Sequence, residues 1–150
     1  MLNIIKNNFD ITGKSPDQIG PLKLAYLGDA VYELIIRTML MDESDRSVKK
    51  MNRLAQNIVN AGTQARIAKL IKPELSEEEL AIFRRGRNAK SISVAKHADI
   101  RDYRVATGLE ALYGYWYLSD KMERAICLTS AAIDNLKKTP INTPDPLRRV

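Results

Sequence analysis

Two acidic residues, Asp29 and Glu110, have sequence surroundings in which a carboxylate is unusual. Glu110 is the one charged residue in VATGLEALYGYWYL (residues 105–118), and Asp29 follows Gly28 inside the apolar-rich stretch LAYLGDAVYELIIR (24–37). Two carboxylates brought together repel each other, and a bound Mg²⁺ ion would remove that repulsion while keeping several waters. Such an ion can activate water toward a phosphodiester. The alternative, which spacing alone favours, is that Glu110 is buried and paired with an Arg or Lys of another helix.

Helices must position both residues, because the sequence has no alternating β-branched runs and no Asn-Gly or Asp-Gly hairpin turn. One helix, over about residues 21–41, begins with a proline and carries Asp29. Another, over about 102–118, carries Glu110. Four more are predicted over residues 47–59, 62–71, 76–85 and 120–136. Their signals are Ser47 as a cap, Gly62 as a break, a capping box of Ser76 with Glu79, and Asp120 with Glu123 as a cap. Residues 86–101 have weak periodicity and are predicted to be largely loop.

The faces of the two long helices predict where the acids lie. The stripe predicted to face the core on the first helix consists of Leu24, Leu27, Val31, Leu34 and Ile35. Asp29 is about 160° away from that stripe. The helix over 102–118 is apolar, small or aromatic on both sides, which predicts that it is covered on both sides. Gly28 and Gly114 stand close to the two acids, and each costs its helix about 1 kcal/mol. A glycine in such a place indicates that backbone or a ligand comes close.

The length and composition favour one all-α domain. The 150 residues are 45% hydrophobic, with no apolar run that approaches a membrane span and no secretory signal. One cysteine and one histidine exclude a disulfide framework, a cysteine-rich metal site and motifs that need two histidines. We therefore expect a cytoplasmic protein with a single domain over 1–137 and a proline-containing tail over 138–150.

Positive charge is concentrated in one block. Seven cations and two acids give residues 84–104 a net charge of +5, whereas the rest of the chain is close to neutral at +1. A localised basic block of this kind is typical of phosphate binding, most often of nucleic acid. The alternative is a solvated helix end and loop that is kept basic for solubility.

Three stretches together resemble one known family. YLGDAVYEL (26–34) resembles the nuclease-domain motif of the ribonuclease III family, and ATGLEALYGYWYL (106–118) resembles the second motif of that family. With GRNAKS (86–91) between them, the order and spacing are similar to one branch in particular, Mini-ribonuclease III. Members of that branch consist of the nuclease domain alone, without a double-stranded-RNA-binding domain. The resemblance covers about residues 20–136.

The resemblance implies a fold, an activity and a site. The fold would be an all-α ribonuclease III-like endonuclease domain of about seven helices, and the active form a homodimer. The activity would be cleavage of double-stranded RNA, with Asp29 and Glu110 as the catalytic pair that binds Mg²⁺, or Mn²⁺ as a substitute. The branch is associated with maturation of the ends of large-subunit ribosomal RNA precursors. Ribosomal proteins or an assembling ribosomal subunit are therefore implied as further partners.

Two positions depart from full-length ribonuclease III. That protein has a Glu four residues before the motif Asp, where this chain has Ala25, and an Asp three residues before the second-motif Glu, where this chain has Thr107. Members of the Mini-ribonuclease III branch resemble this chain in both substitutions. Fewer carboxylates predict more waters on the metal and weaker metal binding in the absence of RNA.

The basic block supplies the expected RNA contacts. Duplex RNA is recognised mainly through phosphates, 2′-hydroxyls and shape, and a lone nuclease domain must make those contacts itself. The candidate RNA-binding residues are Arg84, Arg85, Arg87, Asn88, Lys90, Ser91, Lys96, His97, Arg101 and Arg104. For His97, contact with RNA and packing within the loop are equally supported. The aromatic residues over 113–117 are expected in the core or a dimer interface.

Two other functions compete with a duplex-RNA nuclease. One is a non-catalytic RNA-binding or ribosome-assembly module on the same fold, for which the missing carboxylates would signal decay. The other is an all-α enzyme that acts on a small phosphorylated substrate. The nuclease is preferred because Asp29 and Glu110 both remain, and a decayed site has no reason to keep a Glu in an otherwise uncharged helix.

Overall fold

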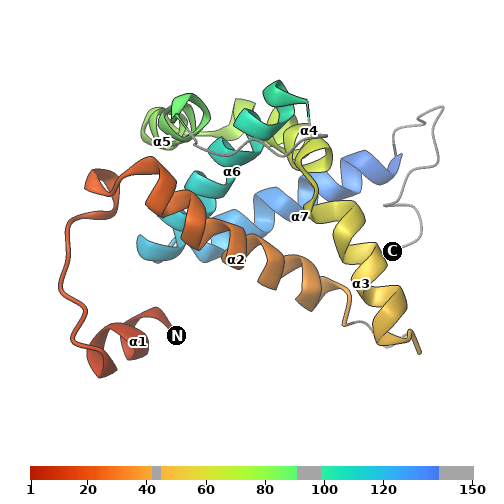
Figure 1. Cartoon of the computed structure of the whole chain (residues 1–150), viewed down its shortest axis with the longest axis horizontal. Helices are drawn as coiled ribbons and strands as arrows, with labels where there is room; N and C mark the ends of the chain where they lie inside the picture. Colours follow the sequence, from red (N-terminus) through yellow and green to blue (C-terminus); the bar gives the residue numbers. More distant parts are fainter. Residues whose placement is uncertain (42–44, 91–98, 139–150) are drawn as a thin grey trace.

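The computed structural model describes residues 1–41, 45–90 and 99–138, and every regular element in these ranges is helical. The α-helices are α1 (Leu2–Asn8), α2 (Pro21–Met39), α3 (Val48–Val59), α4 (Ala61–Ile71), α5 (Glu77–Asn88), α6 (Ile100–Leu118) and α7 (Met122–Lys138). Two short 3₁₀ helices, η1 (Pro16–Gln18) and η2 (Lys72–Glu74), precede α2 and α5. The predicted all-α fold is confirmed (Figure 1). The short helix α1 at the N-terminus was not predicted.

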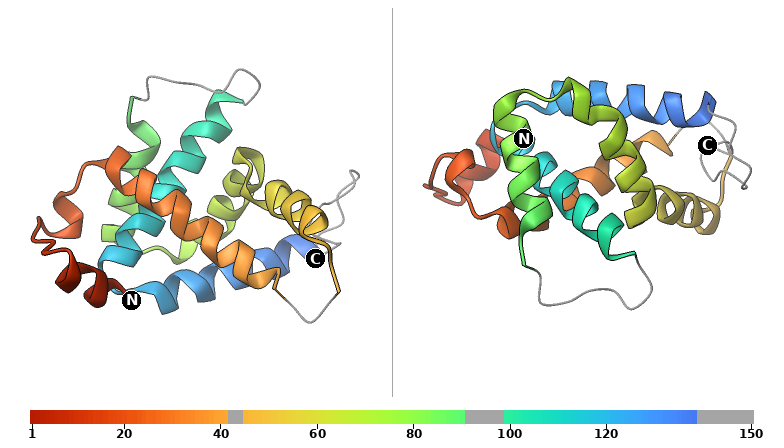
Figure 2. Two further views of the ribbon diagram at one scale, coloured as in Figure 1. Left: turned by 60° about the horizontal axis from the view of Figure 1, so that its bottom comes forward. Right: turned by 90° about the horizontal axis from the view of Figure 1, so that it is seen from above.

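Helix α6 is the centre of the molecule. It packs against α2, α4, α5 and α7, and Figures 1 and 2 show these helices arranged around it. From residue 106 to residue 116 every side chain of α6 is buried except that of Glu110. A helix that is apolar all round has to be covered all round, so the prediction for this helix is confirmed. Glu110 is therefore the one charged residue between positions 106 and 116 of α6.

Two glycines bring the backbones of α2 and α6 into direct contact. A Cβ atom on Gly28 would lie 1.7 Å from the carbonyl oxygen of Glu110, and one on Gly114 would lie 2.1 Å from the carbonyl oxygen of Leu24. No side chain of any other residue fits at either place. A second close crossing joins α5 to α6, where a Cβ on Gly86 would lie 2.9 Å from the Cα of Gly108. The helix penalty of these glycines is thus offset by close helix packing.

The buried face of α2 differs from the predicted stripe. Its buried residues are Leu24, Ala25, Gly28, Val31, Tyr32 and Ile36. Leu34 is 53% exposed, so its predicted place in the core is wrong. The face is rotated because α6 presents small residues, which accept α2 on its Ala25–Gly28 side. Asp29 is consequently about 90° from the centre of the buried face, at its border rather than on the far side.

The starts of α3 and α5 follow the predicted capping signals. Ser47 Oγ accepts a hydrogen bond from the backbone N–H of Lys50 at 3.4 Å. Ser76 and Glu79 form the reciprocal capping box, at 3.2 Å and 2.8 Å. Helix α4 instead begins after Asn60, whose Oδ1 accepts from the N–H of Thr63 at 2.9 Å.

Three other boundaries differ from prediction. Helix α5 continues to Asn88, which places residues 86–88 on a helix rather than in a loop. Helix α6 begins two residues early, because the Asp99 carboxylate caps it by accepting from the N–H of Arg101 at 2.8 Å. Helix α7 begins at Met122, and Asp120 lies in the preceding turn with a positive φ of 57°.

A buried carboxylate ties three helices together on the side of α6 where α5 and α7 pack. Glu79 of α5 is 2% exposed and accepts hydrogen bonds from Trp116 Nε1 of α6 at 2.8 Å and Arg124 Nε of α7 at 2.6 Å. Burial alone would raise the pKa of Glu79. The hydrogen bonds from Arg124, Trp116 and the backbone of Ser76 outweigh burial and lower this pKa to about 2.

In the described ranges, none of the helices combines the length and the apolar character that a bilayer crossing requires.

Candidate active site

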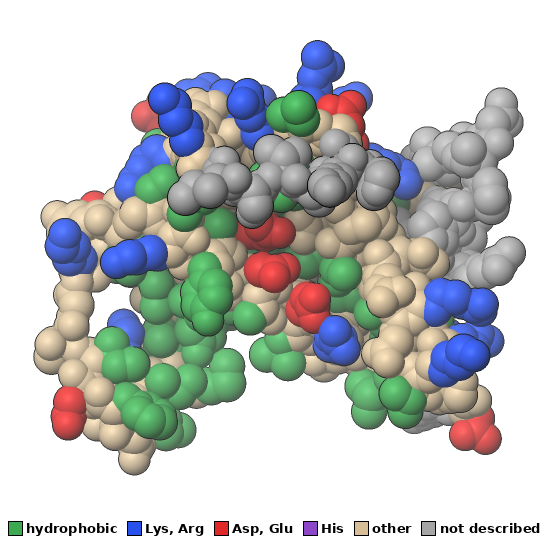
Figure 3. Space-filling model, in the orientation of Figure 1, with side chains coloured by type: hydrophobic (Ala, Val, Ile, Leu, Met, Phe, Trp, Pro, Cys, Tyr) green, Lys and Arg blue, Asp and Glu red, His purple; other side chains and the backbone are tan. Residues whose placement is uncertain are grey.

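Asp29 and Glu110 line the same cavity between α2 and α6. The cavity has a volume of about 480 Å³, and its other lining residues are Leu22, Ala25, Tyr26, Leu27, Ala30, Tyr103 and Thr107. Figure 3 shows acidic side chains gathered near the middle of the face that it draws. The fold thus brings together two carboxylates that stand out in the sequence. They lie on different helices, and the two residues are 81 positions apart in the chain.

The pKa values of both carboxyl groups in this cavity are raised. Burial raises the pKa of Glu110 to about 7, and the nearby charge of Asp29 adds to the shift. Burial and the charge of Glu33 also raise the pKa of Asp29. Across the described ranges no Lys or Arg forms an ion pair with Glu110. The alternative in which Glu110 is neutralised by a basic residue of another helix therefore finds no support in this part of the chain.

Gln64 is a site residue that the sequence reasoning missed. It lies on α4, is 1% exposed, and hydrogen-bonds with the carboxylate of Glu110, which lowers the pKa of Glu110 and so opposes the effect of burial. A signal was present in the sequence, because Gln64 shares a buried helical face with Ile67, Ala68 and Ile71. A buried amide in an apolar stripe needs a partner, and here the partner is Glu110.

The donor set of the cavity contains two carboxylates. Ala25 and Thr107, which replace the other two acids of full-length ribonuclease III, both line the cavity, and Thr107 Oγ1 donates to the carbonyl oxygen of Tyr103 at 3.1 Å. Over 1–41, 45–90 and 99–138 no three His, Cys, Asp or Glu side chains come together as a metal cluster. Mg²⁺ is commonly held by one or two carboxylates with waters in its other positions. The residues present therefore fit a divalent cation that is bound largely through water and substrate.

Four predicted RNA-binding residues meet at a second hollow. Arg87 and Asn88 at the end of α5, and Arg101 and Arg104 at the start of α6, line a space of about 430 Å³ together with Asp99, Ile100 and Val105. We call this space the α5–α6 hollow. The extra turn of α5 beyond its predicted end is what carries Arg87 and Asn88 there.

The remaining candidates fall into three groups. Arg85 donates to the carbonyl oxygens of Asp17 and Ile19, at 2.6 Å and 2.9 Å, so its guanidinium holds the segment before α2. Arg84 and Lys90 are exposed. Ser91, Lys96 and His97 lie outside the described residues.

Comparison with known proteins identifies the class to which this fold and site belong. Residues 22–121 match the family described as Ribonuclease III domain. Because this match spans more than half of the chain, the protein belongs to the ribonuclease III domain family. Within that family it belongs to the Mini-ribonuclease 3 branch, as its relatives show.

Two of those relatives are bacterial proteins of similar length. The Mini-ribonuclease 3 of Desulfitobacterium hafniense (strain Y51) is 47% identical over 113 residues, which cover 75% of this chain and 71% of that protein. The Mini-ribonuclease 3 of Clostridium tetani is 44% identical over 116 residues, which cover 77% of each chain. The crystal structure of protein FN1578 from Fusobacterium nucleatum is similar in fold, with a TM-score of 0.73 and 32% identity over 82% of this chain and 98% of that one. The resemblance inferred from the motifs is confirmed.

Proposed function

We propose that the protein is an endoribonuclease that cuts double-stranded RNA at the Asp29–Glu110 cavity with the help of a divalent cation. The observation that carries this proposal is the state of Glu110. It is a largely buried acid whose pKa is raised to about 7, it lines the same cavity as a second carboxylate, and it has no cationic partner among the described residues. Such an arrangement is costly for stability, and a cation bound between the two acids would offset the cost.

Asp29, Glu110 and Gln64 have distinct parts in this proposal. Asp29 and Glu110 would hold Mg²⁺, or Mn²⁺ in its place, and the ion supplies Lewis acidity and an activated water for attack on a phosphodiester. Glu110 must release its proton to bind a cation, because its pKa lies near neutrality. Gln64 orients the Glu110 carboxylate through its hydrogen bond. Asp29 is exposed at the border of the buried face of α2, so a duplex could reach it.

The α5–α6 hollow would hold the RNA backbone. Arg87, Arg101 and Arg104 carry guanidinium groups that bind phosphate oxygens, and the Asn88 amide can bond to a phosphate or a 2′-hydroxyl. The exposed Arg84 and Lys90 add positive charge at the end of α5. Ser91, Lys96 and His97 complete the proposed RNA-binding set. We propose that in the cell the protein matures the ends of large-subunit ribosomal RNA precursors, with ribosomal proteins or an assembling ribosomal subunit as further partners.

We also propose that the active form is a homodimer. Tyr26 is 86% exposed and Leu22 is 43% exposed, and both border the carboxylate cavity. A large exposed aromatic side chain beside an apolar neighbour is typical of a protein–protein contact. A second copy seated there would place two cavities on one assembly, so that both strands of a duplex could be cut.

Sedimentation equilibrium tests the dimer. We expect the wild-type protein to have twice the 16.9 kDa mass of the chain, and the Tyr26→Asp variant to shift toward the single-chain mass. Leu34→Asp is the control, since Leu34 is an exposed apolar residue of α2 outside the cavity. A wild-type protein that sediments as one chain at micromolar concentration would overturn the dimer. Dissociation by Leu34→Asp alone would put the interface elsewhere on α2.

The cation dependence of duplex cleavage tests the proposed activity. We expect a perfect RNA duplex to be cut in the presence of Mg²⁺, cutting to stop with a chelator, and Mn²⁺ to restore it. The separated strands and a DNA duplex of the same sequence serve as controls and should survive. Tight duplex binding without any cutting would favour the non-catalytic module instead. No affinity for the duplex at moderate salt would favour an enzyme acting on a small phosphorylated substrate.

A further inference from the structure

A second basic surface lies on α3, outside the block at residues 84–104. Between residues 46 and 73 the chain has seven cations and no acid. These cations are Arg46, Lys49, Lys50, Arg53, Arg66, Lys69 and Lys72. The net charge outside residues 84–104 is nevertheless only +1, because acids elsewhere in the chain balance these cations. The charge is therefore placed in two blocks rather than one.

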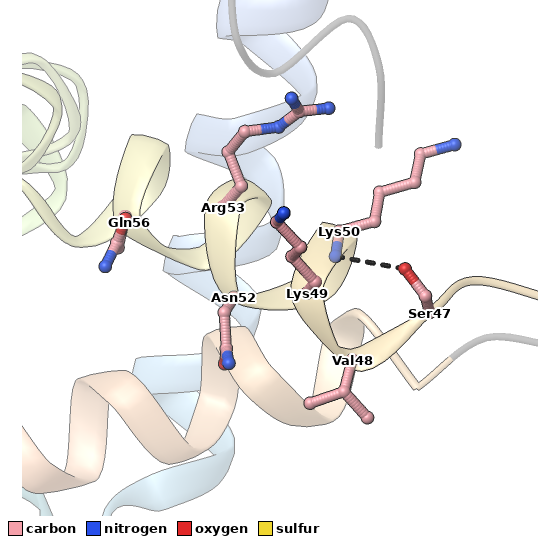
Figure 4. A pocket seen from close by; sticks show the side chains of 7 residues that line it. All are labelled: Ser47, Val48, Lys49, Lys50, Asn52, Arg53 and Gln56. Atoms are coloured by element: carbon pink, nitrogen blue, oxygen red, sulfur yellow. Dashed lines mark hydrogen bonds between the residues drawn. The ribbon is translucent and has the colours of Figure 1, made fainter.

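The periodicity of α3 sorts this charge onto one face. Leu54, Ala55 and Ile58 are buried against the core. Lys49, Asn52, Arg53 and Gln56 recur at helical spacing on nearly the opposite side and are exposed, as is Lys50. These five residues, here called the α3 ridge, line an open hollow of about 740 Å³ with Ser47 and Val48. Figure 4 shows the cationic side chains extending outward from the helix.

The charges of the α3 ridge have no partner inside the described chain. Lys49, Lys50 and Arg53 make no ion pair with any described residue. Lys49 and Lys50 also stand in the first turn of α3, which contains no acid. Cations at a helix N-terminus oppose the helix dipole and so destabilise the helix. The positive charge of the α3 ridge therefore does not stabilise α3.

The position of the ridge relative to the carboxylates is fixed by packing. The Tyr32 hydroxyl on α2, three positions after Asp29, donates to the carbonyl oxygen of Ile58 on α3 at 3.1 Å. Figure 3 shows acidic side chains in the middle of its face, with Lys and Arg side chains over α5 to one side and over α3 to the other. A duplex is stiff over the length of a small protein. One that crosses the carboxylate cavity along the line from α5 to α3 therefore extends over both basic surfaces (Figure 3).

We propose that the α3 ridge binds the phosphate backbone of the same duplex RNA that the Asp29–Glu110 cavity cuts, on the side away from the α5–α6 hollow. This inference rests on the proposed function. The ridge extends about 10 Å from Lys49 to Gln56, and it combines ammonium and guanidinium groups with two amides that can bond to phosphates and 2′-hydroxyls. It contains no aromatic side chain on which single-stranded bases could stack. An A-form backbone is recognised through such contacts.

The salt dependence of duplex binding tests the ridge, in an Asp29→Asn background so that the RNA stays intact. We expect Lys49→Ala with Lys50→Ala to lower the affinity about tenfold and to reduce the slope of log K against log salt by about 2, since each lost phosphate contact removes roughly 0.9. The same charge is removed by Lys69→Ala with Lys72→Ala, from exposed lysines of the same basic run that lie on α4 and η2. This control should leave the slope unchanged. Lys49→Arg with Lys50→Arg should bind like the parent protein.

Folding does not complicate the result, because alanine is a strong helix former and removing cations from the first turn favours α3. Arg87→Ala, in the α5–α6 hollow, is the reference and should lower the slope by about 1. If Arg87→Ala weakens binding while the α3 double variant matches its α4 control, the ridge proposal is overturned and the proposed function stands. If the parent protein does not bind the duplex at all, the proposed function fails, and the ridge proposal falls with it.

Discussion

The Asp29→Asn variant is expected to lose at least about 10³-fold in the rate of duplex-RNA cleavage while it still binds the duplex. Asn keeps the shape of Asp but not its charge. In the described part of the chain the cavity contains two carboxylates and no third metal-binding side chain beside them. Removing one therefore halves the charge available to a cation. A site with four carboxylates would be buffered against such a loss, and this one is not.

The Asp29→Asn variant should lose activity without losing stability. The charge of Asp29 helps to raise the pKa of Glu110 to about 7. A raised pKa means that the ionised form of Glu110 costs stability, so this cost is absent below the ordinary pKa of 4.5 and fully present above about pH 7. Asp29→Asn lowers the cost by removing the repulsion. At pH 8 without metal, we expect the variant to resist urea at least as well as the wild type, which separates lost chemistry from lost folding.

A matched control is available one turn along the same helix. Glu33 is a surface acid that pairs with Arg37 at 2.7 Å and does not line the cavity. Single-turnover cleavage by Glu33→Gln should stay within a few-fold of the wild type, because the same charge is lost outside the site. Wild-type rates for Asp29→Asn would place the reaction elsewhere. Equal inertness of the wild type and Asp29→Asn, with duplex binding intact, would identify a non-catalytic module.

The carboxylate pair could be found from sequence because its signal is local. A single charge in the apolar run around Glu110 is visible without knowing what packs there, and the turn signals at Ser47 and Ser76 are equally local. The orientation of α2 is a different matter. It depends on small residues of α6, far away in the chain, that pack against Ala25 and Gly28. The periodicity of α2 alone therefore predicted Leu34 in the core.

The missed contacts also depend on distant partners. Gln64 is an uncharged residue whose meaning comes from Glu110, on another helix. The guanidinium of Arg85 bonds to carbonyl oxygens 66 and 68 positions earlier, and no spacing rule relates such positions. The basic face of α3 needed no partner to be seen. The net charge outside residues 84–104 does not reveal it, because acids elsewhere in the chain balance these cations.

The second large effect is expected for Gly28→Ala. The new Cβ would lie 1.7 Å from the carbonyl oxygen of Glu110 and 2.7 Å from the backbone nitrogen of Gly114. Both atoms belong to the backbone and cannot rotate away, so α2 and α6 must separate along the largest interface of the fold. Alanine is the better helix former by about 1 kcal/mol. We nevertheless expect a net loss of about 3 kcal/mol in the free energy of unfolding, which corresponds to a fall in Tm of roughly 6–12 °C.

Urea denaturation with two further glycine variants shows whether backbone contact is the cause. Gly62→Ala in α4 is the control, since its Cβ would come no nearer than 3.4 Å to any neighbour, and its stability should be unchanged or slightly higher. Gly114→Ala would bring a Cβ of α6 to 2.1 Å from the carbonyl oxygen of Leu24 on α2, in the same contact between the two helices. One separation of the helices relieves both clashes, so the double variant should lose less than the sum of the single losses. Strict additivity, or a Gly28→Ala protein as stable as Gly62→Ala, would mean that the two backbones do not touch. If they do touch, the same separation moves Glu110 away from Asp29, and the stability loss should carry a loss of cleavage with it.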